Sequence, residues 1–419
     1  MAEEKRSSFL SRLGPGLITG AADDDPSGIG TYSQVGAQFG YGLSWSLLFS
    51  LPFMTVIQDV AAQIGSVTGR GIAANLRRHY PRPLLWFAVT LLLIANVVNL
   101  GADLSAMGAA MHLLIGGQML LYTLGFGLLC LLLEVLLSYR RYAAVLKFTT
   151  LSLFAYVAVV FAVHVPWAQA IGALLVPHVE WTAAFATGFV AILGTTISPY
   201  LFFWQAAQEI EEERRTHSKP LYVSPRRAGA EMKRIRQDTL VGMVFSNIVA
   251  VFIVWAAAAT LHVNGVTTIN TSAEAAQALE PVAGCFAFLL FALGIIGTGM
   301  LAVPVLAGSA AYAVSEMFGR PASLDSKPGK ARTFYGTIAA TTIAGALLQY
   351  VGINPVRALY WSAVINGLLA APLMVVMMLI VTNPRAMGHL TLGRSGAILG
   401  WAAAAVMALA TVLFFASLF

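Results

Sequence analysis

Charged residues are scarce in this chain, since Asp, Glu, Lys and Arg together make up only 11% of its 419 residues. An ordinary water-soluble domain carries about 25% charged residues. Hydrophobic residues make up 58%, and the excess runs from Leu13 to Phe419 instead of forming a single anchor. These proportions exclude a soluble multi-domain enzyme, a nucleic-acid-binding protein and a disordered protein. They predict a polytopic membrane protein.

Cysteine is almost absent as well: the chain has two, Cys130 and Cys285, and both fall within or at the edge of apolar segments. We expect them to be small core residues rather than a disulfide or a metal-binding pair. The N-terminal MAEEKRSS is not followed by a short apolar run with a small-residue cleavage site. It is typical of a cytoplasmic lead-in rather than a signal peptide.

A membrane-spanning helix needs about 20 apolar residues, and the apolar runs between polar breaks predict eleven such spans. The first, sixth and eighth are long and carry Gly, Pro or acidic residues in the middle, so we expect these three helices to be broken. The approximate ranges are 13–39, 42–65, 84–112, 115–137, 142–164, 182–208, 240–262, 282–315, 334–351, 357–381 and 395–417.

The basic residues test this map. If the N-terminus is cytoplasmic, every Lys and Arg except Arg357 falls in an inner segment or at the inner end of a span. Positive charge concentrates in cytoplasmic loops, so we expect a cytoplasmic N-terminus, an external C-terminus and an inner-membrane location. The isoelectric point of 9.4 is then a topology signal, with anionic lipids as the partner of the inner loops. We expect no nucleic-acid partner and no obligate protein partner.

Seven of the 19 acidic residues fall at or near membrane depth, where a carboxylate costs at least about 2.5–3.5 kcal/mol. No Lys or Arg is expected at a comparable depth to neutralise them, which indicates a cation. Hard divalent cations prefer carboxylate, carbonyl and hydroxyl oxygens. The seven residues are Asp23, Asp24, Asp25, Asp59, Asp103, Glu134 and Glu209.

The densest acidic cluster is the run Asp-Asp-Asp-Pro-Ser-Gly at 23–28, in the middle of the first span. Adjacent carboxylates, a proline and a glycine disfavour a continuous helix there. Unwound backbone at membrane depth is tolerated where it lines a cavity, and its freed carbonyls can coordinate a cation. The alternative is a solvated loop between two short hydrophobic pieces. However, residues 13–22 are too short to span, and moving the boundary would spoil the charge distribution.

A second break is predicted at 194–200, where Gly-Thr-Thr-Ile-Ser-Pro-Tyr interrupts the sixth span. A lone kink of this kind is more often structural. Here, however, the breaks at Pro26 and Pro199 each lie in the first helix of a five-helix block, and paired breaks in inverted halves are typical of a transporter's central site. We therefore expect one all-α transmembrane transporter domain over 1–419. It would contain two inverted five-helix repeats, 13–164 and 182–381, and an additional helix at 395–417.

The other intramembrane polar residues are less specific. Asp59 and Asp103 could line a pathway or accept hydrogen bonds from neighbouring helices. Glu134 is expected to pair with the nearby Arg140 or Arg141, and Glu209 is expected to share a solvated face with the glutamates that follow it. Four amides could line a cavity or join helices: Asn96, Asn99, Asn247 and Gln349.

Short motifs in the first span resemble the NRAMP divalent-metal transporters: Gly-Pro-Gly at 14–16, Asp-Pro-Ser-Gly at 25–28 and Gly-Ala-Gln-Phe-Gly-Tyr-Gly at 36–42. The helix count, the two breaks and Asp103 agree with the same family over essentially the whole chain. The resemblance implies a LeuT-type fold, alternating access, and a divalent metal ion as the transported substrate. It implies no cofactor and no enzymatic activity.

The departures from the family pattern carry further information. The family's first-helix motif is Asp-Pro-Gly-Asn, so this chain keeps the liganding Asp25 but has Gly28 in place of the Asn. In the sixth helix, typically Ala-Thr-Val-Met-Pro-His, Ser198 stands where the metal-binding Met would be and Tyr200 where the His would be. Thioether sulfur favours softer transition metals, whereas hydroxyl, carbonyl and water suit Mg²⁺ and Mn²⁺. This pattern resembles the NRAMP-related magnesium transporters, a branch in which proton coupling is absent.

We therefore expect import of Mg²⁺, and also of Mn²⁺, without proton coupling. The alternatives are a proton-coupled Mn²⁺ or Fe²⁺ transporter of the same family, a sodium-coupled amino-acid symporter on the same fold, and a membrane enzyme. Three consecutive aspartates argue against the symporter, and no nucleophile–base pair or phosphate-binding loop supports the enzyme. The expected metal site comprises Asp24, Asp25, Gly28, Thr195 and Ser198, and the possible pathway comprises Asp23, Asp59, Asp103, Tyr200, Asn247 and Gln349.

Overall fold

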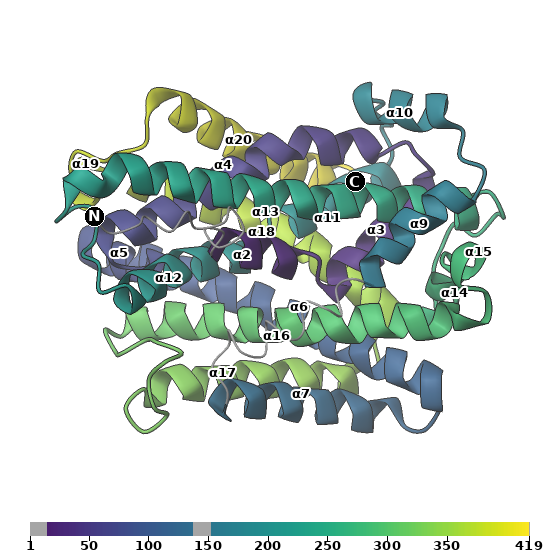
Figure 1. Ribbon diagram of the computed structural model, residues 1–419, viewed down its shortest axis with the longest axis horizontal. Coiled ribbons are helices and arrows are strands. Elements are labelled where there is room, and N and C mark those ends of the chain that lie inside the picture. The colour runs from purple at the N-terminus through teal and green to yellow at the C-terminus, as the bar shows by residue number, and fades with distance from the viewer. Residues whose placement is uncertain (1–14, 137–151, 419) are drawn as a thin grey trace, which may run out of the picture.

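Every secondary-structure element in the described residues of this computed structural model, 15–136 and 152–418, is a helix. The long helices run side by side, and short helices lie at both ends of the bundle (Figure 1). Among the described residues, nine helices are long and apolar enough to cross a membrane. The chain is a multi-pass membrane protein, as the composition predicts.

The nine helices match nine of the predicted spans, with ends that differ by a few residues, except that α12 and α13 extend by polar turns, α13 starting at Ala228 rather than at 240. They are α4 (Ser44–Thr68), α6 (Arg82–Ile115), α7 (Met119–Leu136), α11 with α12 (Ala183–Arg215), α13 with the turns flanking it (Pro225–His262), α15 with α16 (Glu280–Met317), α17 with the turn after it (Arg332–Val351), α18 (Pro355–Val381) and α20 (Arg394–Ala416).

The first and sixth predicted spans are broken as expected. The first consists of α2 (Pro15–Asp23) and α3 (Pro26–Phe39), and the sixth of α11 (Ala183–Thr196) and α12 (Pro199–Arg215). In each case a proline opens the second piece, where its missing N–H is not needed and its fixed φ suits the helix. Proline therefore marks both breaks, as the first residue of the second half-helix in each case.

The prediction of a break in the eighth span is wrong. Helix α16 (Ala287–Met317) continues through Pro304. A proline removes one backbone hydrogen bond, and neighbouring helices allow a membrane helix to tolerate that loss. Here α16 packs along both α6 and α12, and this packing holds the helix together through the proline.

Two other expectations are changed or left partly open by the described residues. Cys130 is buried as expected, but Cys285 is exposed, because it lies in the turn that precedes α16, and neither cysteine forms a disulfide. Of the fifth predicted span, 142–164, the structure describes residues from 152 onward, where α9 covers Phe154–Ala162. The count of eleven spans therefore stays a prediction.

Four short helices that the apolar pattern does not reveal cover the ends of the bundle: α5 (Ile72–His79), α10 (Trp167–Leu175), α14 (Ser272–Gln277) and α19 (Pro384–Met387). The short helix α15 (Glu280–Ala283) precedes α16 at the start of the eighth span. Figure 1 places α5, α19 and the end of α12 at one end of the molecule and α14 and α15 at the other. The arginines of the first three elements therefore share one end, which the charge distribution predicts to be cytoplasmic.

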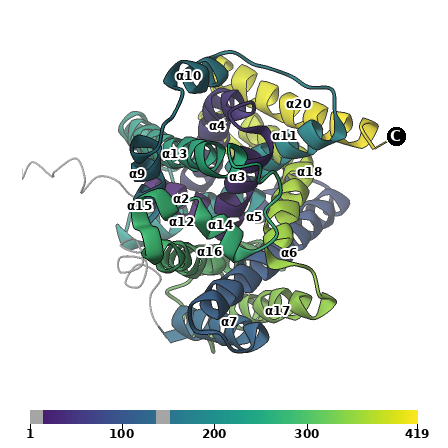
Figure 2. The ribbon, with the colours of Figure 1, turned by 90° about the vertical axis from the view of Figure 1, so that its right-hand side faces the viewer.

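The two broken helices occupy the centre of the bundle (Figure 2). Helix α2 packs against α12 and α13, and α3 packs against α11, α13 and α18. Glycine permits the closest crossings: a side chain at Gly20 would collide with the backbone of Gly242, and one at Gly194 with the backbone of Ala363 and Gly367. Small residues at such crossings let membrane helices approach until their backbones touch. This close packing brings the two breaks together.

Candidate functional site

The two helix breaks adjoin at the centre of the bundle. The Tyr200 hydroxyl, one residue into α12, donates to the Ala22 carbonyl of α2 at 3.0 Å. A side chain at Gly28 of α3 would lie 3.2 Å from the Thr195 hydroxyl of α11. Residues 173 positions apart, such as Pro26 and Pro199, thus frame one small polar region. Both halves of the predicted site are present in it.

Asp25 is the best-connected carboxylate of this region. Its Oδ1 accepts hydrogen bonds from the Gly28 backbone N–H at 2.7 Å and from the Ser27 hydroxyl at 2.8 Å. Its Oδ2 accepts from the Asn99 amide of α6 at 2.9 Å and from the Tyr200 hydroxyl at 3.3 Å. A carboxylate offers about four lone-pair positions. Those of Asp25 take three full donors and one shared donor, from three different segments, because the single Tyr200 proton is shared with the Ala22 carbonyl.

The two preceding aspartates are buried but face another helix. Asp23 and Asp24 are 1% and 2% exposed. Both lie at hydrogen-bond distance from one hydroxyl, that of Ser246 in α13, at 2.7 and 3.1 Å. One hydroxyl has one proton, so it can satisfy only one of the two carboxylates at a time. The pair therefore contributes negative charge next to Asp25 without converging on it.

The second break supplies hydroxyl and carbonyl oxygens. Ser198 stands at the N-cap of α12, and its hydroxyl donates back to the Thr195 carbonyl at 2.9 Å and lies 3.0 Å from the Gly194 carbonyl. The Thr195 hydroxyl is buried and has no hydrogen-bond partner among the described residues. The lone pairs of both hydroxyls are thus free to accept a further donor or a cation.

Helix α6 completes the region with two residues on one face. Asp103 is fully buried beside Asp25 and the Ser27 backbone, and its two carboxylate oxygens lack a hydrogen-bond partner in the described part of the chain. Asn99, one helical turn earlier, donates its amide to Asp25 while its carbonyl oxygen Oδ1 has no such partner. The sequence predicted Asn99 as either a cavity liner or an interhelical hydrogen-bond partner, and the structure shows the interhelical hydrogen bond. Its four-residue spacing from Asp103 was the available signal.

Sequence reasoning missed two further residues of the region. Ser246 joins α13 to the aspartates, and the fully buried Tyr32 of α3 lies beside the same aspartates and Thr195. Neither residue belongs to a recognisable motif. Their places follow from how α13 and α3 are rotated about their axes, which local composition does not determine.

Three of the candidate pathway residues lie away from this region. Asp59 of α4 accepts from Gln63 at 2.7 Å and pairs with Arg236 of α13 at 3.5 Å. Asn247 donates to the Leu47 carbonyl at 3.0 Å and so ties α13 to α4. Gln349 lies in the turn after α17. The structure thus brings together Asp25, Gly28, Thr195, Ser198, Tyr200 and Asp103, with Asp23 and Asp24 next to them.

The expectation that Glu209 lies on a solvated face is wrong. Glu209 is 1% exposed and pairs with Arg234 of α13 at 2.6 Å. Arg234 also holds Glu231 at 2.8 Å and lies 3.8 Å from Asp238. Together with the Asp59–Arg236 pair, this shows that arginine does neutralise some of the deep acids. Both arginines come from the polar first turns of α13, which the sequence assigned to a loop.

Glu134 was expected to pair with Arg140 or Arg141. Both of these arginines lie outside the described residues.

The acids around Arg234 also fasten α2 to the rest of the bundle. The Gly16 backbone N–H donates to Asp238 at 2.8 Å, and the Thr19 hydroxyl donates to Gln205 of α12. Gln205 in turn donates to Glu209 at 3.1 Å. Arg234 therefore stands at the centre of a network that joins α2, α12 and α13. We call this network the α2 latch.

Comparison with known proteins identifies the family. The sequence profile described as natural resistance-associated macrophage protein-like matches residues 16–417. The chain belongs to this family. A divalent metal cation transporter, MntH, of Klebsiella pneumoniae is 26% identical over 96% of this chain and 93% of its own length. MntH of Deinococcus radiodurans is 27% identical over 95% of this chain and 88% of its own length. These relatives are transporters and not enzymes.

Solved structures agree on the fold. The manganese transporter of Eremococcus coleocola, in complex with an aromatic bis-isothiourea compound, superposes with a TM-score of 0.75 at 17% identity, over 99% of this chain and 88% of that one. The inward-facing conformation of Mhp1 gives a TM-score of 0.52 at 14% identity, over 96% and 90% of the two chains. The expected LeuT-type fold is confirmed.

The polar groups around the two breaks are single oxygen atoms rather than a cluster of metal-ligating side chains. No three His, Cys, Asp or Glu side chains converge in a metal-binding arrangement among the described residues. The available oxygen atoms near Asp25 are its own carboxylate, the Asn99 carbonyl oxygen and the Thr195 hydroxyl, and Ser198 adds a hydroxyl beside the Thr195 carbonyl. Such a set suits a hard divalent cation that keeps part of its water shell.

If the α2 latch holds α2 in place, weakening it should expose buried positions of α2 to a soluble reagent. Replacing Arg234 by Gln leaves Glu209, Glu231 and Asp238 without their shared cation, and removing one partner of a buried ion pair is strongly destabilising. We expect α2 to detach more often, so that a cysteine placed at the buried Ala22, in a chain without Cys130 and Cys285, reacts several-fold faster with a maleimide.

The matched control is Arg215→Gln, because Arg215 is exposed and pairs within its own helix with Glu212. It should leave the labelling rate of the Ala22→Cys protein unchanged. Equal labelling rates in the Arg234→Gln and Arg215→Gln proteins would show that the latch does not hold α2.

Proposed function

We propose that this chain imports divalent metal cations by alternating access, with Mg²⁺ and Mn²⁺ as substrates and Asp25 as the anchoring ligand. The observation that supports this most directly is the meeting of two proline-interrupted helices around a buried carboxylate. Asp103 lies beside it, and the two preceding aspartates, Asp23 and Asp24, add negative charge nearby. Membership of the NRAMP family and the divalent-metal transport named for its MntH relatives agree with it.

Ion binding at Asp25 requires that one of its four donors leaves. The Tyr200 hydroxyl makes the longest of the four hydrogen bonds and already has a second acceptor, the Ala22 carbonyl. It is therefore the donor that a cation displaces most easily. Rotation of the Asn99 amide by half a turn would exchange its N–H for its unpartnered carbonyl oxygen. Asn99 would then supply from α6 the carboxamide ligand that Gly28 cannot supply from α3.

The preference for Mg²⁺ and Mn²⁺ is supported by the donor set. Ser198 places a hydroxyl at the position where the family pattern has a thioether, and Thr195 adds a second hydroxyl. Oxygen ligands favour hard ions, whereas sulfur favours softer ones. Mg²⁺ retains waters and is commonly held by one or two carboxylates, which matches one anchoring Asp25 with the charge of Asp23 and Asp24 nearby.

A second candidate is a proton-coupled Mn²⁺ or Fe²⁺ transporter. The position of Asp103 favours it, because this buried carboxylate lies beside Asp25 without a hydrogen-bond partner among the described residues and could carry a proton. Against coupling, Tyr200 stands where the family pattern has a His, and an ordinary tyrosine does not exchange protons near neutral pH.

Removal of the anchoring carboxylate should abolish transport. Asp25→Asn is expected to lower the rate of Mg²⁺ and Mn²⁺ uptake into proteoliposomes by about 100-fold or more, and Asn99→Ala, which removes a supporting residue, by about 10-fold. The control is Asp325→Asn, an exposed carboxylate outside the bundle core. Full uptake by the Asp25→Asn protein would refute the site assignment.

A thioether at the second break should change ion selectivity. Ser198→Met is expected to shift the competition between Mg²⁺ and Cd²⁺ towards Cd²⁺, because sulfur prefers the softer ion. The measurement is the Cd²⁺ concentration that halves Mg²⁺ uptake, with Ser198→Ala as the control for loss of the hydroxyl alone. An unchanged Cd²⁺ concentration in the Met variant contradicts the proposed role of Ser198.

Proton coupling can be tested with the same proteoliposomes. Uptake of Mg²⁺ or Mn²⁺, present in competition, is followed together with a pH-sensitive dye inside the vesicles. We expect metal entry without acidification of the lumen. Acidification that tracks metal entry, and that disappears in an Asp103→Asn protein, would instead support the proton-coupled candidate.

A further inference from the structure

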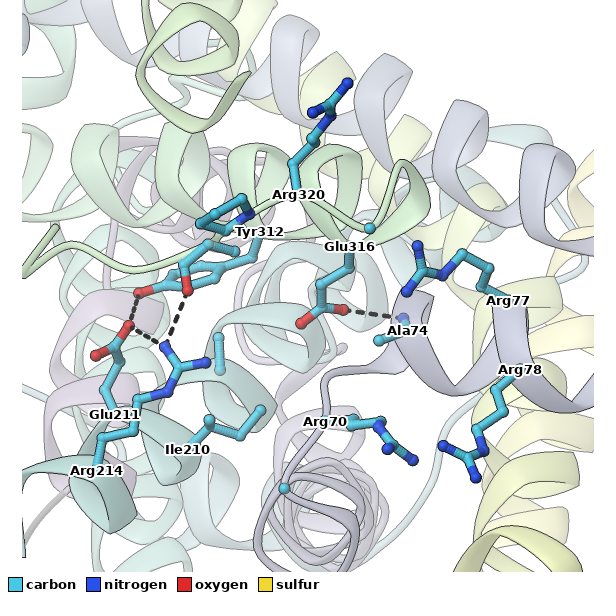
Figure 3. Close-up of a pocket in the computed structure, with 15 residues that line it drawn as sticks. Arg70, Ala74, Arg77, Arg78, Ile210, Glu211, Arg214, Tyr312, Glu316 and Arg320 are labelled. Atoms are coloured by element: carbon cyan, nitrogen blue, oxygen red, sulfur yellow. Dashed lines mark hydrogen bonds and ion pairs between the residues drawn. The ribbon is translucent and has the colours of Figure 1, made fainter. Parts of the chain in front are cut away.

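A cavity of about 500 Å³ lies at the arginine-bearing end of the bundle, away from the helix breaks. Its walls are the residues after α4, helix α5, the last turns of α12 and α16, and the segment that follows α16 (Figure 3). Its volume falls within the range of about 300–1,000 Å³ that is usual for small-molecule sites. We call it the arginine cavity.

Five arginines from four separate segments line the arginine cavity. Arg70 follows α4, Arg77 and Arg78 lie in the last turn of α5, Arg214 lies in the last turn of α12, and Arg320 follows α16. Figure 3 shows the side chains of Arg70, Arg77 and Arg78 on one side of Glu316 and that of Arg214 on the other. Arginines that serve only to orient a membrane protein need not gather around one cavity; Arg226 and Arg227, for example, do not line it.

The two carboxylates of the cavity are already engaged elsewhere. Glu316 accepts the Ala74 backbone N–H at 3.1 Å, in the first turn of α5. Glu211 accepts from the Tyr312 hydroxyl at 3.0 Å and the Ser323 hydroxyl at 3.1 Å, and it lies 3.5 Å from Arg214. Each carboxylate therefore holds a wall of the cavity together rather than neutralising its interior.

The other four arginines lack an acidic partner. Within the residues that the structure describes, no ion pair joins Arg70, Arg77, Arg78 or Arg320 to a carboxylate. Burial and the neighbouring Arg78 and Arg77 lower the pKa of Arg70. The positive charges of α5 and the loop before it therefore repel one another, and an anion between them would relieve that repulsion.

We propose that the arginine cavity binds a phosphate-bearing anion. The planar guanidinium group offers paired N–H donors that match two phosphate oxygens at once, and it carries its charge at every physiological pH. Several guanidinium groups from different segments suit an anion that presents several phosphate oxygens in different directions. The phosphate can come from a soluble polyphosphate or from the headgroup of an anionic lipid, and the experiment below separates these sources.

Occupation of the cavity would link the last turn of α12 to α5 and to the segment that follows α4. Helix α12 begins directly after Ser198 at the second break and ends beside Arg214. An anion held by Arg214 together with Arg70 and Arg78 would connect the far end of α12 to α4 and α5. An effect of the anion on uptake rests on the proposed transport function, whereas binding of the anion does not.

Binding can be measured on the purified protein in a neutral detergent, with EDTA present so that no divalent cation contributes. Pyrophosphate is titrated by calorimetry. We expect saturable binding by the wild-type protein and an affinity lowered by about tenfold or more in Arg70→Gln/Arg78→Gln, since each substitution removes a charge-assisted hydrogen-bond donor to the anion. A second double variant, Arg77→Gln/Arg320→Gln, should also bind pyrophosphate with lower affinity than the wild type.

The control pair is Arg226→Gln/Arg227→Gln, which removes the same charge from exposed positions outside the cavity. It should bind pyrophosphate as the wild type does, and so should Asp25→Asn, whose metal site is separate. Thermal melting of each protein checks that the fold is intact. Affinity that is the same in both cavity pairs and in the control pair overturns the proposal.

Nanodiscs identify the source of the phosphate. If phosphatidylglycerol nanodiscs weaken pyrophosphate binding relative to phosphatidylcholine nanodiscs, and the cavity pairs lose retained phosphatidylglycerol in native mass spectrometry, the ligand is a lipid headgroup. If pyrophosphate binds equally in both nanodiscs, it is a soluble anion. Absence of pyrophosphate binding, with equal retention of phosphatidylglycerol by wild-type and variant proteins, overturns the proposal for both sources.

Discussion

A carboxylate in the middle of a membrane protein must be satisfied by the protein itself, and the saturation of Asp25 is the interaction on which the rest of the structure depends. Its two oxygens take donors from its own helix turn, from α6 and from α12. Three of those donors, Ser27, Gly28 and Tyr200, lie in the first turns of α3 and α12, directly after the breaks. Hydrogen bonding to Asp25 therefore stabilises both breaks.

The same constraint explains how the surroundings are built. Backbones must approach closely for a short side chain such as Ser246 to reach the aspartates, and Gly20 and Gly242 provide this approach between α2 and α13. Near the N-terminal end of α2, Glu209 of α12 and Glu231 and Asp238 of α13 are neutralised by Arg234. One end of α2 is thus held by hydrogen bonds to Asp238 and Gln205, and the other by hydrogen bonds at the helix break. A helix held in this way can be released when either set of contacts changes.

Much of this architecture could be predicted from local composition. Proline with adjacent acids at 23–28 and with hydroxyl residues at 194–200 marks a broken helix wherever it falls in the chain, and apolar length gives the other spans. Contacts set by helix rotation could not be predicted, which is why Ser246 and the role of Asn99 became visible only in the structure. Glu209 was misjudged because its sequence neighbours are glutamates, whereas its burial depends on Arg234, 25 residues later. Pro304 was misjudged because packing against α6 overrides its local effect.

The central claim is that oxygen atoms from both helix breaks bind the transported ion at Asp25. Anomalous X-ray diffraction from crystals grown with Mn²⁺ tests it most directly, because the ion can be located without reference to any activity. The account predicts one anomalous peak in contact with the Asp25 carboxylate and with an oxygen of Thr195 or Ser198, lost when Mg²⁺ is added in excess. A peak that lies away from Asp25, or that persists in excess Mg²⁺, would contradict it.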